Sequence, residues 1–317
     1  MALAEWVANG RPPYDLWPVD IRRFGKPHQD LEWVRKRTYE AYAKHYTMAW
    51  PFEENSSVRE FKKSPIYEKL KNSNACFGEK MGWERPNWFA PKGSEPRDIY
   101  SFDRQNWFEF VGNEVKAARE SAVLIDQTSF AKFIVSGKDS LQALEYLCAN
   151  KIDRPIGSTI YTQMLNDDGG IECDLTITVI DKNTFYIITG TGFMTHDYDW
   201  IISNIPNNLE VEVKNITFDN SVFSLMGPNS RKILQGLTNT DLSNDNFPFA
   251  TCKKIKIASK DVYAIRITYM GELGWELHFP IDFSSEIYSK IMEYGNQFGL
   301  VNAGYRCIES CRLEKGY

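Results

Sequence analysis

Residues 159–180, TIYTQMLNDDGGIECDLTITVI, decide the fold class of this chain. Residues 159–165 and 171–180 are rich in β-branched and apolar side chains, and the turn-forming sequence NDDGG joins them, so the pattern predicts an antiparallel β-hairpin. Alternation along the second strand puts Asp174 on one face with Thr176 and Thr178 and leaves Cys173 on the other, apolar face. An Asp beside a turn usually caps it, but a polar face of this kind can also line a cavity.

Outward from this hairpin, further strands occur in groups with helices between the groups. Strands joined by short turns rather than by helical crossovers favour an α+β fold with antiparallel sheets and interspersed helices. The other predicted strands are 131–136, 184–189, 209–213, 222–226, 254–258, 262–270 and 275–279, and the predicted helices include 31–45, 64–70, 113–122, 194–203, 227–237, 283–294 and 305–317. Residues 78–89, GEKMGWERPNWF, are so rich in Gly, Pro and Trp that no regular element is predicted there.

Composition is that of a folded, globular chain. The 317 residues have a formal net charge of −5, 43% hydrophobic and 25% charged residues, and an unusual 14% of aromatic residues. No apolar run approaches the roughly 18 residues of a membrane helix, and no basic block suggests a nucleic-acid partner. Composition therefore argues against a membrane-spanning helix and, weakly, against a general nucleic-acid binder.

Cysteines and histidines give no local metal or redox motif. The six cysteines are scattered without a CxxC pair, which favours a reducing compartment. Cys307 and Cys311 are spaced for one helix face and are interpreted as small buried residues. The four histidines are far apart in sequence, so a metal site would need a three-dimensional assembly that the sequence does not predict.

Nucleotide-binding loops are also absent or incomplete. There is no P-loop motif, and Gly190-Thr191-Gly192 lacks the third glycine of a dinucleotide loop, so it is interpreted as a tight turn into a helix.

Residues 269–276, YMGELGWE, form the second candidate site. Two predicted strands flank a Gly-x-x-Gly turn, which would bring Tyr269 and Glu276 towards one another across the pair. An aromatic face beside a carboxylate suits a flat heterocycle with ring N–H donors. A purely structural hairpin explains the same residues equally well.

These segments resemble one family. Residues 162–175 (TQMLNDDGGIECDL), 226–229 (MGPN), 269–276 (YMGELGWE) and 312–316 (RLEKG) resemble, in this order, the tetrahydrofolate-binding aminomethyltransferase module of the glycine cleavage T-protein. GEKMGWERPNWF resembles the segment before that module in dimethylglycine and sarcosine dehydrogenases and their flavin-dependent relatives. Residues 2–25 resemble the last helix of their flavin domain and the start of the connecting domain.

The resemblance implies a division of the chain and a T-protein-like fold. Residues 1–18 would end a flavin domain, 19–62 would form the middle domain, and 63–317 would form the folate-binding domain. The flavin domain would then precede Ala2 and a C-terminal β domain would follow Tyr317, so the chain is expected to be a fragment.

The resemblance also implies an activity. In this family FAD oxidises an N-methyl group of dimethylglycine or sarcosine, and tetrahydrofolate captures the one-carbon unit as 5,10-methylenetetrahydrofolate. The family's catalytic carboxylate corresponds to Asp174, expected to be partly buried and to assist proton movement. Its pterin-stacking and pterin-binding residues correspond to Tyr269 and Glu276, and Tyr161 matches another folate-contacting aromatic. No residue is assigned to a metal.

Some positions depart from the family pattern, and two other functions remain open. The T-protein has two adjacent Asp residues where this chain has Cys173-Asp174, and its folate-site Arg aligns with Ile308.

The alternatives are a free-standing aminomethyltransferase or demethylase, and a non-catalytic relative such as the pyruvate dehydrogenase phosphatase regulatory subunit. The family implies bacterial cytoplasm or, in a eukaryote, the mitochondrial matrix.

Overall fold

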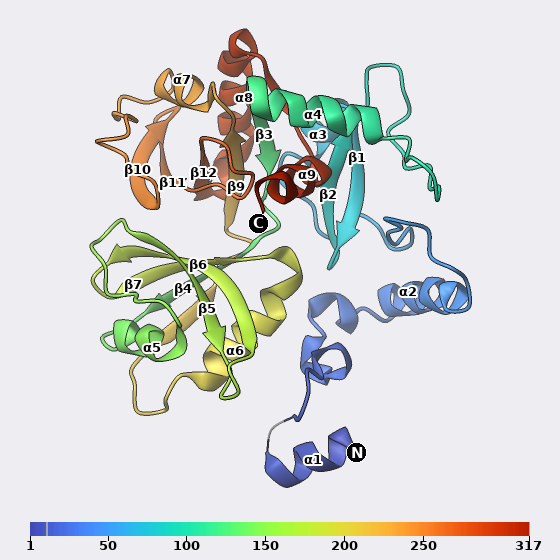
Figure 1. The fold of residues 1–317 in the computed structure, drawn as a ribbon, viewed down its shortest axis with the longest axis vertical. Coiled ribbons are helices and arrows are strands. Elements are labelled where there is room, and N and C mark those ends of the chain that lie inside the picture. The colour runs from blue at the N-terminus through green and yellow to red at the C-terminus, as the bar shows by residue number, and fades with distance from the viewer. Residues whose placement is uncertain (11, 317) are drawn as a thin grey trace.

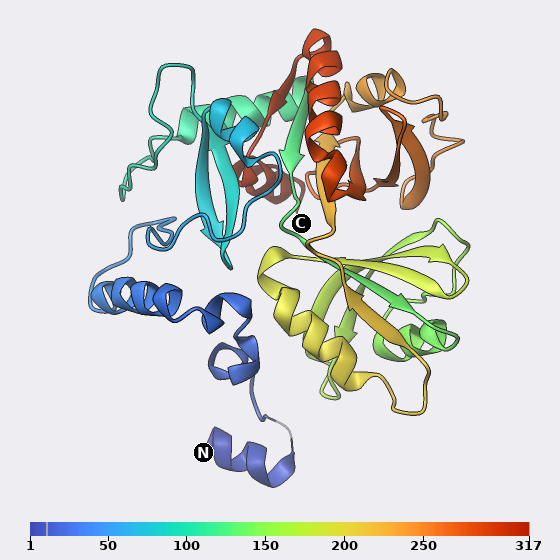
Figure 2. The ribbon, with the colours of Figure 1, turned by 180° about the vertical axis from the view of Figure 1, so that it is seen from behind.

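Two β-sheets, each with its own helices, form the two main lobes of the molecule (Figure 1). The computed structural model describes residues 1–10 and 12–316. The C-terminal end lies near the junction of the two lobes, whereas the N-terminal end lies far from it (Figures 1 and 2). The architecture is α+β with predominantly antiparallel sheets, as the sequence predicts.

The five-stranded sheet contains the hairpin that decided the fold class. Its strand order is β5-β6-β7-β4-β8 and every pairing is antiparallel. Apolar residues on one face, Leu175 and Ile177 among them, pack against Leu144 of α5 and Ile201 of α6. The elements are β4 Ala131–Ser136, α5 Ser140–Leu147, β5 Thr159–Leu165, β6 Ile171–Asp181, β7 Thr184–Thr189, η4 Thr191–Phe193, α6 Met194–Asn204 and β8 Glu212–Asn215.

The six-stranded sheet has the order β10-β11-β12-β9-β3-β13, and its only parallel pair within the described chain is β13 with β3. Helices α7 and α8 cover one face and α4 and α9 cover the other. The elements are α4 Phe108–Glu120, β3 Ala122–Asp126, β9 Asn220–Met226, α7 Ser230–Gln235, β10 Thr251–Ile257, β11 Lys260–Arg266, β12 Gly274–Pro280, η5 Ile281–Phe283, α8 Ser284–Gly295, η6 Asn296–Phe298, β13 Leu300–Asn302 and α9 Tyr305–Lys315.

The N-terminal segment runs away from the two sheets before the chain enters them (Figure 1). No residue of α1 or α2 is buried. The elements are α1 Ala2–Asn9, η1 Trp17–Val19, η2 Ile21–Arg23, η3 Lys26–Gln29, α2 Leu31–Lys44, α3 Tyr67–Asn72, β1 Ala75–Lys80 and β2 Trp83–Phe89.

The prediction of an irregular segment at 78–89 is wrong. Residues 75–89 form the antiparallel pair β1–β2, with Met81 and Gly82 in left-handed backbone conformations at its turn. Pro86 is accommodated because it pairs with Phe77 beside a register shift, where the regular ladder is already interrupted. Burial of Trp83 and Trp88 stabilises the pair.

Other element predictions also differ from the structure. Strand β3 was not predicted, because five consecutive buried residues show no alternation by which a strand is recognised. The helix predicted at 227–237 is confined to α7, Ser230–Gln235.

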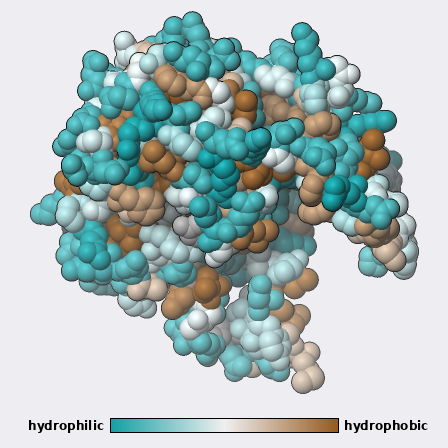
Figure 3. All heavy atoms as spheres, turned by 45° about the horizontal axis from the view of Figure 1, so that its top comes forward, coloured by the Kyte–Doolittle hydropathy of each residue, from teal (hydrophilic) through white to brown (hydrophobic). Residues whose placement is uncertain are grey.

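The surface shows no single dominant apolar region from the side drawn in Figure 3, where hydrophobic residues lie in small groups among hydrophilic ones. Among the described helices, none has both the length and the apolar character to cross a membrane.

Candidate functional site

Asp174 and Tyr161 lie on neighbouring strands of the five-stranded sheet. In the β5–β6 register Gln163 faces Asp174 and Tyr161 faces Thr176. Gln163 Nε2 donates a hydrogen bond of 3.0 Å to Asp174 Oδ1. Hydrogen bonding to Asp174, together with burial, raises the pKa of the Tyr161 hydroxyl. The structure therefore brings together these two residues, which are 13 positions apart in the sequence.

The alternation predicted along this strand is confirmed, but the expected burial of Asp174 is wrong. Cys173 is 1% exposed and Leu175 2%, whereas Asp174 is exposed. The reason is its place on the polar face near the hairpin turn, away from the helices that cover the other face.

Tyr269 does not face Glu276 across a hairpin, so that part of the prediction is wrong. Strand β11 ends at Arg266, and Glu276 of β12 is paired with Ile265 instead. Tyr269 lies in the connecting loop, where it is 46% exposed. It is nevertheless close enough to Tyr161 to contribute to raising the pKa of that residue. The loop that carries Tyr269 and the β5–β6 hairpin that carries Tyr161 therefore meet at the junction of the two sheets.

Arg312 of α9 extends the same region. Its guanidinium carbon lies 5.7 Å from the centre of the Tyr269 ring. Ile308, which aligns with the T-protein arginine, is buried in the core. Arg312 is therefore the described arginine that reaches this tyrosine, whereas Arg306 is paired with Asp98 at 2.6 Å.

Glu276 ends a short chain of polar side chains. Its Oε2 lies 3.5 Å from His278 Nε2, and His278 Nδ1 lies 3.1 Å from the Tyr186 hydroxyl. Burial lowers the pKa of His278, so the imidazole is neutral, and burial keeps the pKa of Tyr186 well above its usual value. Tyr186 can then donate to Nδ1, which leaves the ring proton on Nε2, directed at Glu276.

Tyr186 places this polar chain at the same junction as Tyr161. Thr178 of β6 is paired with Tyr186 of β7 and with Thr159 of β5, so Tyr186 and Tyr161 belong to the same face of the five-stranded sheet. His278 and Glu276 come from the six-stranded sheet. The four residues predicted from sequence therefore border one junction between the sheets.

Sequence reasoning missed several residues at this junction. Tyr305 is 3.1 Å from the Ser129 hydroxyl, and the Arg85 guanidinium lies 4.0 Å from the centre of its ring. Burial raises the pKa of Tyr305 to about 12. His278 could have been predicted from the sequence, because it follows Glu276 by two residues on the same strand and so lies on the same face of it. No sequence pattern connects Tyr305 and Arg85 with the site, since they come from distant segments.

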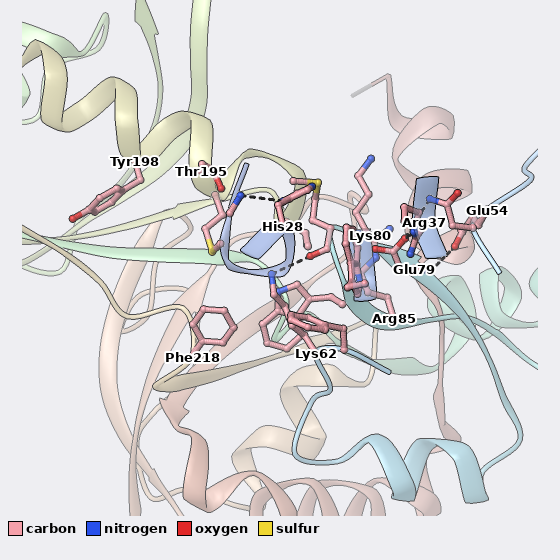
Figure 4. Close-up of a pocket in the computed structure, with 18 of the residues that line it drawn as sticks. His28, Arg37, Glu54, Lys62, Glu79, Lys80, Arg85, Thr195, Tyr198 and Phe218 are labelled. Carbon is pink, nitrogen blue, oxygen red and sulfur yellow. Dashed lines mark hydrogen bonds and ion pairs between the residues drawn. The ribbon is translucent and has the colours of Figure 1, made fainter. Parts of the chain in front are cut away.

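A cavity lies beside this junction rather than on it. It has a volume of about 1100 Å³ and is bordered by the N-terminal segment, the β1–β2 hairpin and α6 (Figure 4). Burial lowers the pKa of Lys62, on its wall, to about 8. None of the four predicted site residues lines it, but Arg85 and Thr191 do. Thr191 is 2.8 Å from Ser129, so the cavity reaches the site at Tyr305.

The arrangement can hold a flat, hydrogen-bonding ligand. Tyr161 and Tyr269 offer exposed aromatic faces from opposite sides of the junction. His278 Nε2 is buried beside Glu276, whose side chain is only 12% exposed. The ring N–H can hold this carboxylate in place, and the carboxylate can still accept hydrogen bonds from a ligand. Among the described residues, Cys173, His196 and Asp197 are the group with metal-ligand geometry.

Two family models match the chain, one to each of two consecutive parts. The model of the GCVT N-terminal domain matches residues 66–317, and that of the FAD dependent oxidoreductase central domain matches residues 9–64. The chain belongs to the GCVT family. Its combination with the oxidoreductase domain is the combination that the sequence motifs indicate.

Individual relatives of this GCVT chain support the same family. Mouse mitochondrial sarcosine dehydrogenase is 34% identical over 99% of the chain and 38% of its own length. Human mitochondrial dimethylglycine dehydrogenase is 37% identical over 99% of the chain and 36% of its own length. The mouse mitochondrial pyruvate dehydrogenase phosphatase regulatory subunit is 31% identical over 99% of the chain and 36% of its own length. The chain spans little more than a third of these relatives.

The fold of the GCVT module also matches a solved structure. The glycine cleavage system aminomethyltransferase T from Bartonella henselae superposes with a TM-score of 0.67 and 22% identity, over 81% of this chain and 63% of that one. At this identity the match shows the T-protein fold alone.

Proposed function

We propose that this chain is the folate-dependent part of an FAD-dependent N-methylglycine dehydrogenase, acting on dimethylglycine or sarcosine. It would capture the one-carbon unit on tetrahydrofolate, giving 5,10-methylenetetrahydrofolate. The observation that carries the proposal is the convergence of Asp174 and Tyr161 with Tyr269 and Glu276 at one junction, from two different sheets.

Each of these residues suits one part of a folate. Tyr161 and Tyr269 have exposed ring faces that can stack on the flat pterin, and Glu276 can accept its ring N–H donors. Arg312, near Tyr269, can pair with a carboxylate of the folate tail. His278 would keep Glu276 oriented towards the pterin.

Asp174 has the position expected of a proton acceptor. The one-carbon unit would arrive as the iminium that oxidation of the N-methyl group leaves. Two nitrogens of tetrahydrofolate would each form a bond to its carbon and lose a proton, while both bonds between that carbon and the amine nitrogen break. One proton would leave with the amine product, and Asp174 would take the other. The carboxylate is fixed by Gln163 and faces Tyr161, so the acceptor is oriented before the substrate arrives. General base catalysis of this kind contributes about 10²–10⁴-fold to a rate.

The division of labour along the chain is part of the proposal. Residues 1–18 would complete a flavin domain, 19–62 would connect it to the folate module, and 63–317 would bind folate. FAD would be held outside the described residues and would oxidise the N-methyl group. The family matches support the second boundary, because the central-domain match ends at residue 64 and the GCVT match begins at residue 66, whereas the central-domain match begins at residue 9 rather than at 19.

Tetrahydrofolate titration by calorimetry tests the proposal. We expect one binding site in the unaltered chain and an affinity at least about tenfold weaker in Tyr269→Ala, because a stacking partner is removed. We expect Asp174→Asn to bind tetrahydrofolate with a smaller loss, but to transfer formaldehyde-derived carbon to it at least about a hundredfold more slowly.

Matched variants control for general effects. Tyr146→Ala removes an exposed tyrosine from α5, and Asp153→Asn changes an exposed carboxylate in the loop that follows α5; both should behave like the unaltered chain. Equal affinity in Tyr269→Ala and Tyr146→Ala would contradict the site, and an absence of folate binding would contradict the function. Folate binding without carbon transfer in the unaltered chain would favour a regulatory role.

A further inference from the structure

Behind the Asp174 face of β6, three side chains from separate positions form a compact polar group. One ligand atom each from Cys173, His196 and Asp197 lies within 4.8 Å of the other two. Cys173 belongs to β6, whereas His196 and Asp197 lie in the first turn of α6. Strand and helix contact each other directly, so the group joins two packed elements.

The simplest alternative is a buried ion pair beside an unreactive cysteine. His196 Nδ1 lies 2.9 Å from Asp197 Oδ1, and Asp197 is 1% exposed. That explanation accounts for two of the side chains. The Cys173 thiol can also hydrogen-bond to Asp197 within such a pair. The pair does not account for the further partners that surround His196 and Asp197.

Those further partners match the outer shell of a metal site. His196 Nε2 lies 3.6 Å from Glu172 Oε2, and Glu172 Oε1 in turn accepts a hydrogen bond of 2.8 Å from Asn166 Nδ2. Metal-ligating histidines almost always donate their second ring N–H to a carboxylate or carbonyl. The Thr189 hydroxyl donates a 2.5 Å hydrogen bond to Asp197 Oδ2, so the second oxygen of this carboxylate is fixed too.

The donor set indicates which ion would fit. Ligand bonds of about 2.0–2.3 Å in a tetrahedral site place neighbouring ligand atoms roughly 3.3–3.8 Å apart, so a group spanning at most 4.8 Å needs only small side-chain shifts. A thiolate with an imidazole and a carboxylate favours zinc over calcium or magnesium, which prefer oxygen ligands alone. Three protein ligands leave a fourth position for water.

We propose that Cys173, His196 and Asp197 form a binding site for a zinc-class divalent cation, with Glu172 and Thr189 as its outer partners. Binding displaces the Cys173 thiol proton to solvent, and no redox change is involved. The ion enters past His196 and Glu172, whose side chains are 14% and 26% exposed.

The site would act on the hairpin rather than on the substrate. Cys173 and Asp174 are adjacent on β6 and face opposite sides of the sheet. A bound ion would fasten the strand that carries Asp174 to the start of α6. This inference does not depend on the proposed folate chemistry, since its ligands lie on the other face of the strand.

Cobalt titration of the 317-residue chain, freed of metal by a chelator, tests the site. Co²⁺ replaces Zn²⁺ in such sites and reports a thiolate ligand through a sulfur-to-metal charge-transfer absorption. We expect one equivalent of Co²⁺ to produce this absorption, Zn²⁺ to abolish it by displacement, and Zn²⁺ to raise the thermal midpoint of unfolding.

Two variants and one control decide the outcome. Cys173→Ala should abolish the absorption, and His196→Gln should weaken Co²⁺ binding at least about a hundredfold. Cys148→Ala should leave both unchanged, because Cys148 is a nearby cysteine outside the group. His196→Gln decides the matter if Cys173→Ala fails to fold, because His196 is partly exposed. An absorption that persists in Cys173→Ala, unweakened binding in His196→Gln, or no signal with a tenfold excess of Co²⁺ would overturn the proposal.

Discussion

At the scale of single residues, the feature that distinguishes the candidate site is the support of Glu276. Its partly buried carboxylate has His278 at 3.5 Å, and that histidine in turn contacts the Tyr186 hydroxyl at 3.1 Å. The chain of contacts crosses from one sheet to the other. His278 is therefore a positioning residue, which orients the carboxylate without touching the ligand.

Replacement of His278 by Phe should weaken tetrahydrofolate binding about tenfold, because Glu276 loses a contact worth about 1.5 kcal/mol for a charged group. The ring volume is nearly kept, so the fold should persist. Calorimetric titration measures the affinity. His278→Gln, which retains a donor, should recover part of the loss, and Tyr186→Phe should have a smaller effect. Full affinity in His278→Phe would show that the histidine serves packing alone.

At the scale of elements, one buried carboxylate fastens the β1–β2 hairpin to the rest of the fold. Glu114 of α4 accepts hydrogen bonds from the backbone N–H groups of Phe89, at 2.7 Å, and Gly304, at 2.9 Å. These residues end β2 and precede α9. Burial raises the pKa of Glu114 to about 8.

This shift predicts a pH dependence of stability. The pKa of Glu114 is higher in the folded chain than in the unfolded chain. The contribution of this carboxyl group to the free energy of unfolding is therefore complete below about pH 4.5 and is lost as the pH rises towards 8. Glu114→Gln cannot ionise, so its free energy of unfolding should fall less across that interval. Urea unfolding at pH 5, 6, 7 and 8 measures both chains. Parallel pH profiles would contradict the assignment.

At the scale of the whole molecule, the N-terminal segment touches the five-stranded lobe through a few contacts. Arg22 pairs with Asp199 of α6 at 2.9 Å and with Asp20 at 2.7 Å. The Trp17 ring packs edge-on against His196, with 4.7 Å between ring centres. These contacts close one side of the large cavity, which Arg22 and Asp199 both line.

Arg22→Ala should loosen this segment with little effect on the lobes. Half-exposed ion pairs contribute only about 0–1 kcal/mol, so the thermal midpoint should change by a few degrees at most. Cleavage by chymotrypsin within the first 30 residues, after Tyr14 or Phe24 for example, should become several-fold faster, as limited proteolysis with mass spectrometry can measure. Lys138→Ala, which breaks another exposed ion pair in the same lobe, is the control. Equal cleavage rates in the two variants would mean that Arg22 does not hold the segment.

Much of the fold was predictable because its signals are local. The alternation in β6, the turn at 166–170 and the helical spacing of α2 and α8 depend only on neighbouring residues, and each element was predicted near its observed bounds. Strand β3 was missed because a fully buried strand has no alternation. The β1–β2 hairpin was missed because its turn residues and tryptophans mask a regular ladder.

The sequence by itself determined the antiparallel α+β class, the family and the four residues of the candidate folate site, since hairpins and short motifs are contiguous in the chain. Only the tertiary structure decided how those residues meet. Tyr269 and Glu276 are not opposed across a hairpin, and the junction is formed by side chains from two sheets. His278, Tyr186 and the Cys173 group are likewise products of packing, because the residues that each contacts lie on separately folded elements and no spacing rule connects them.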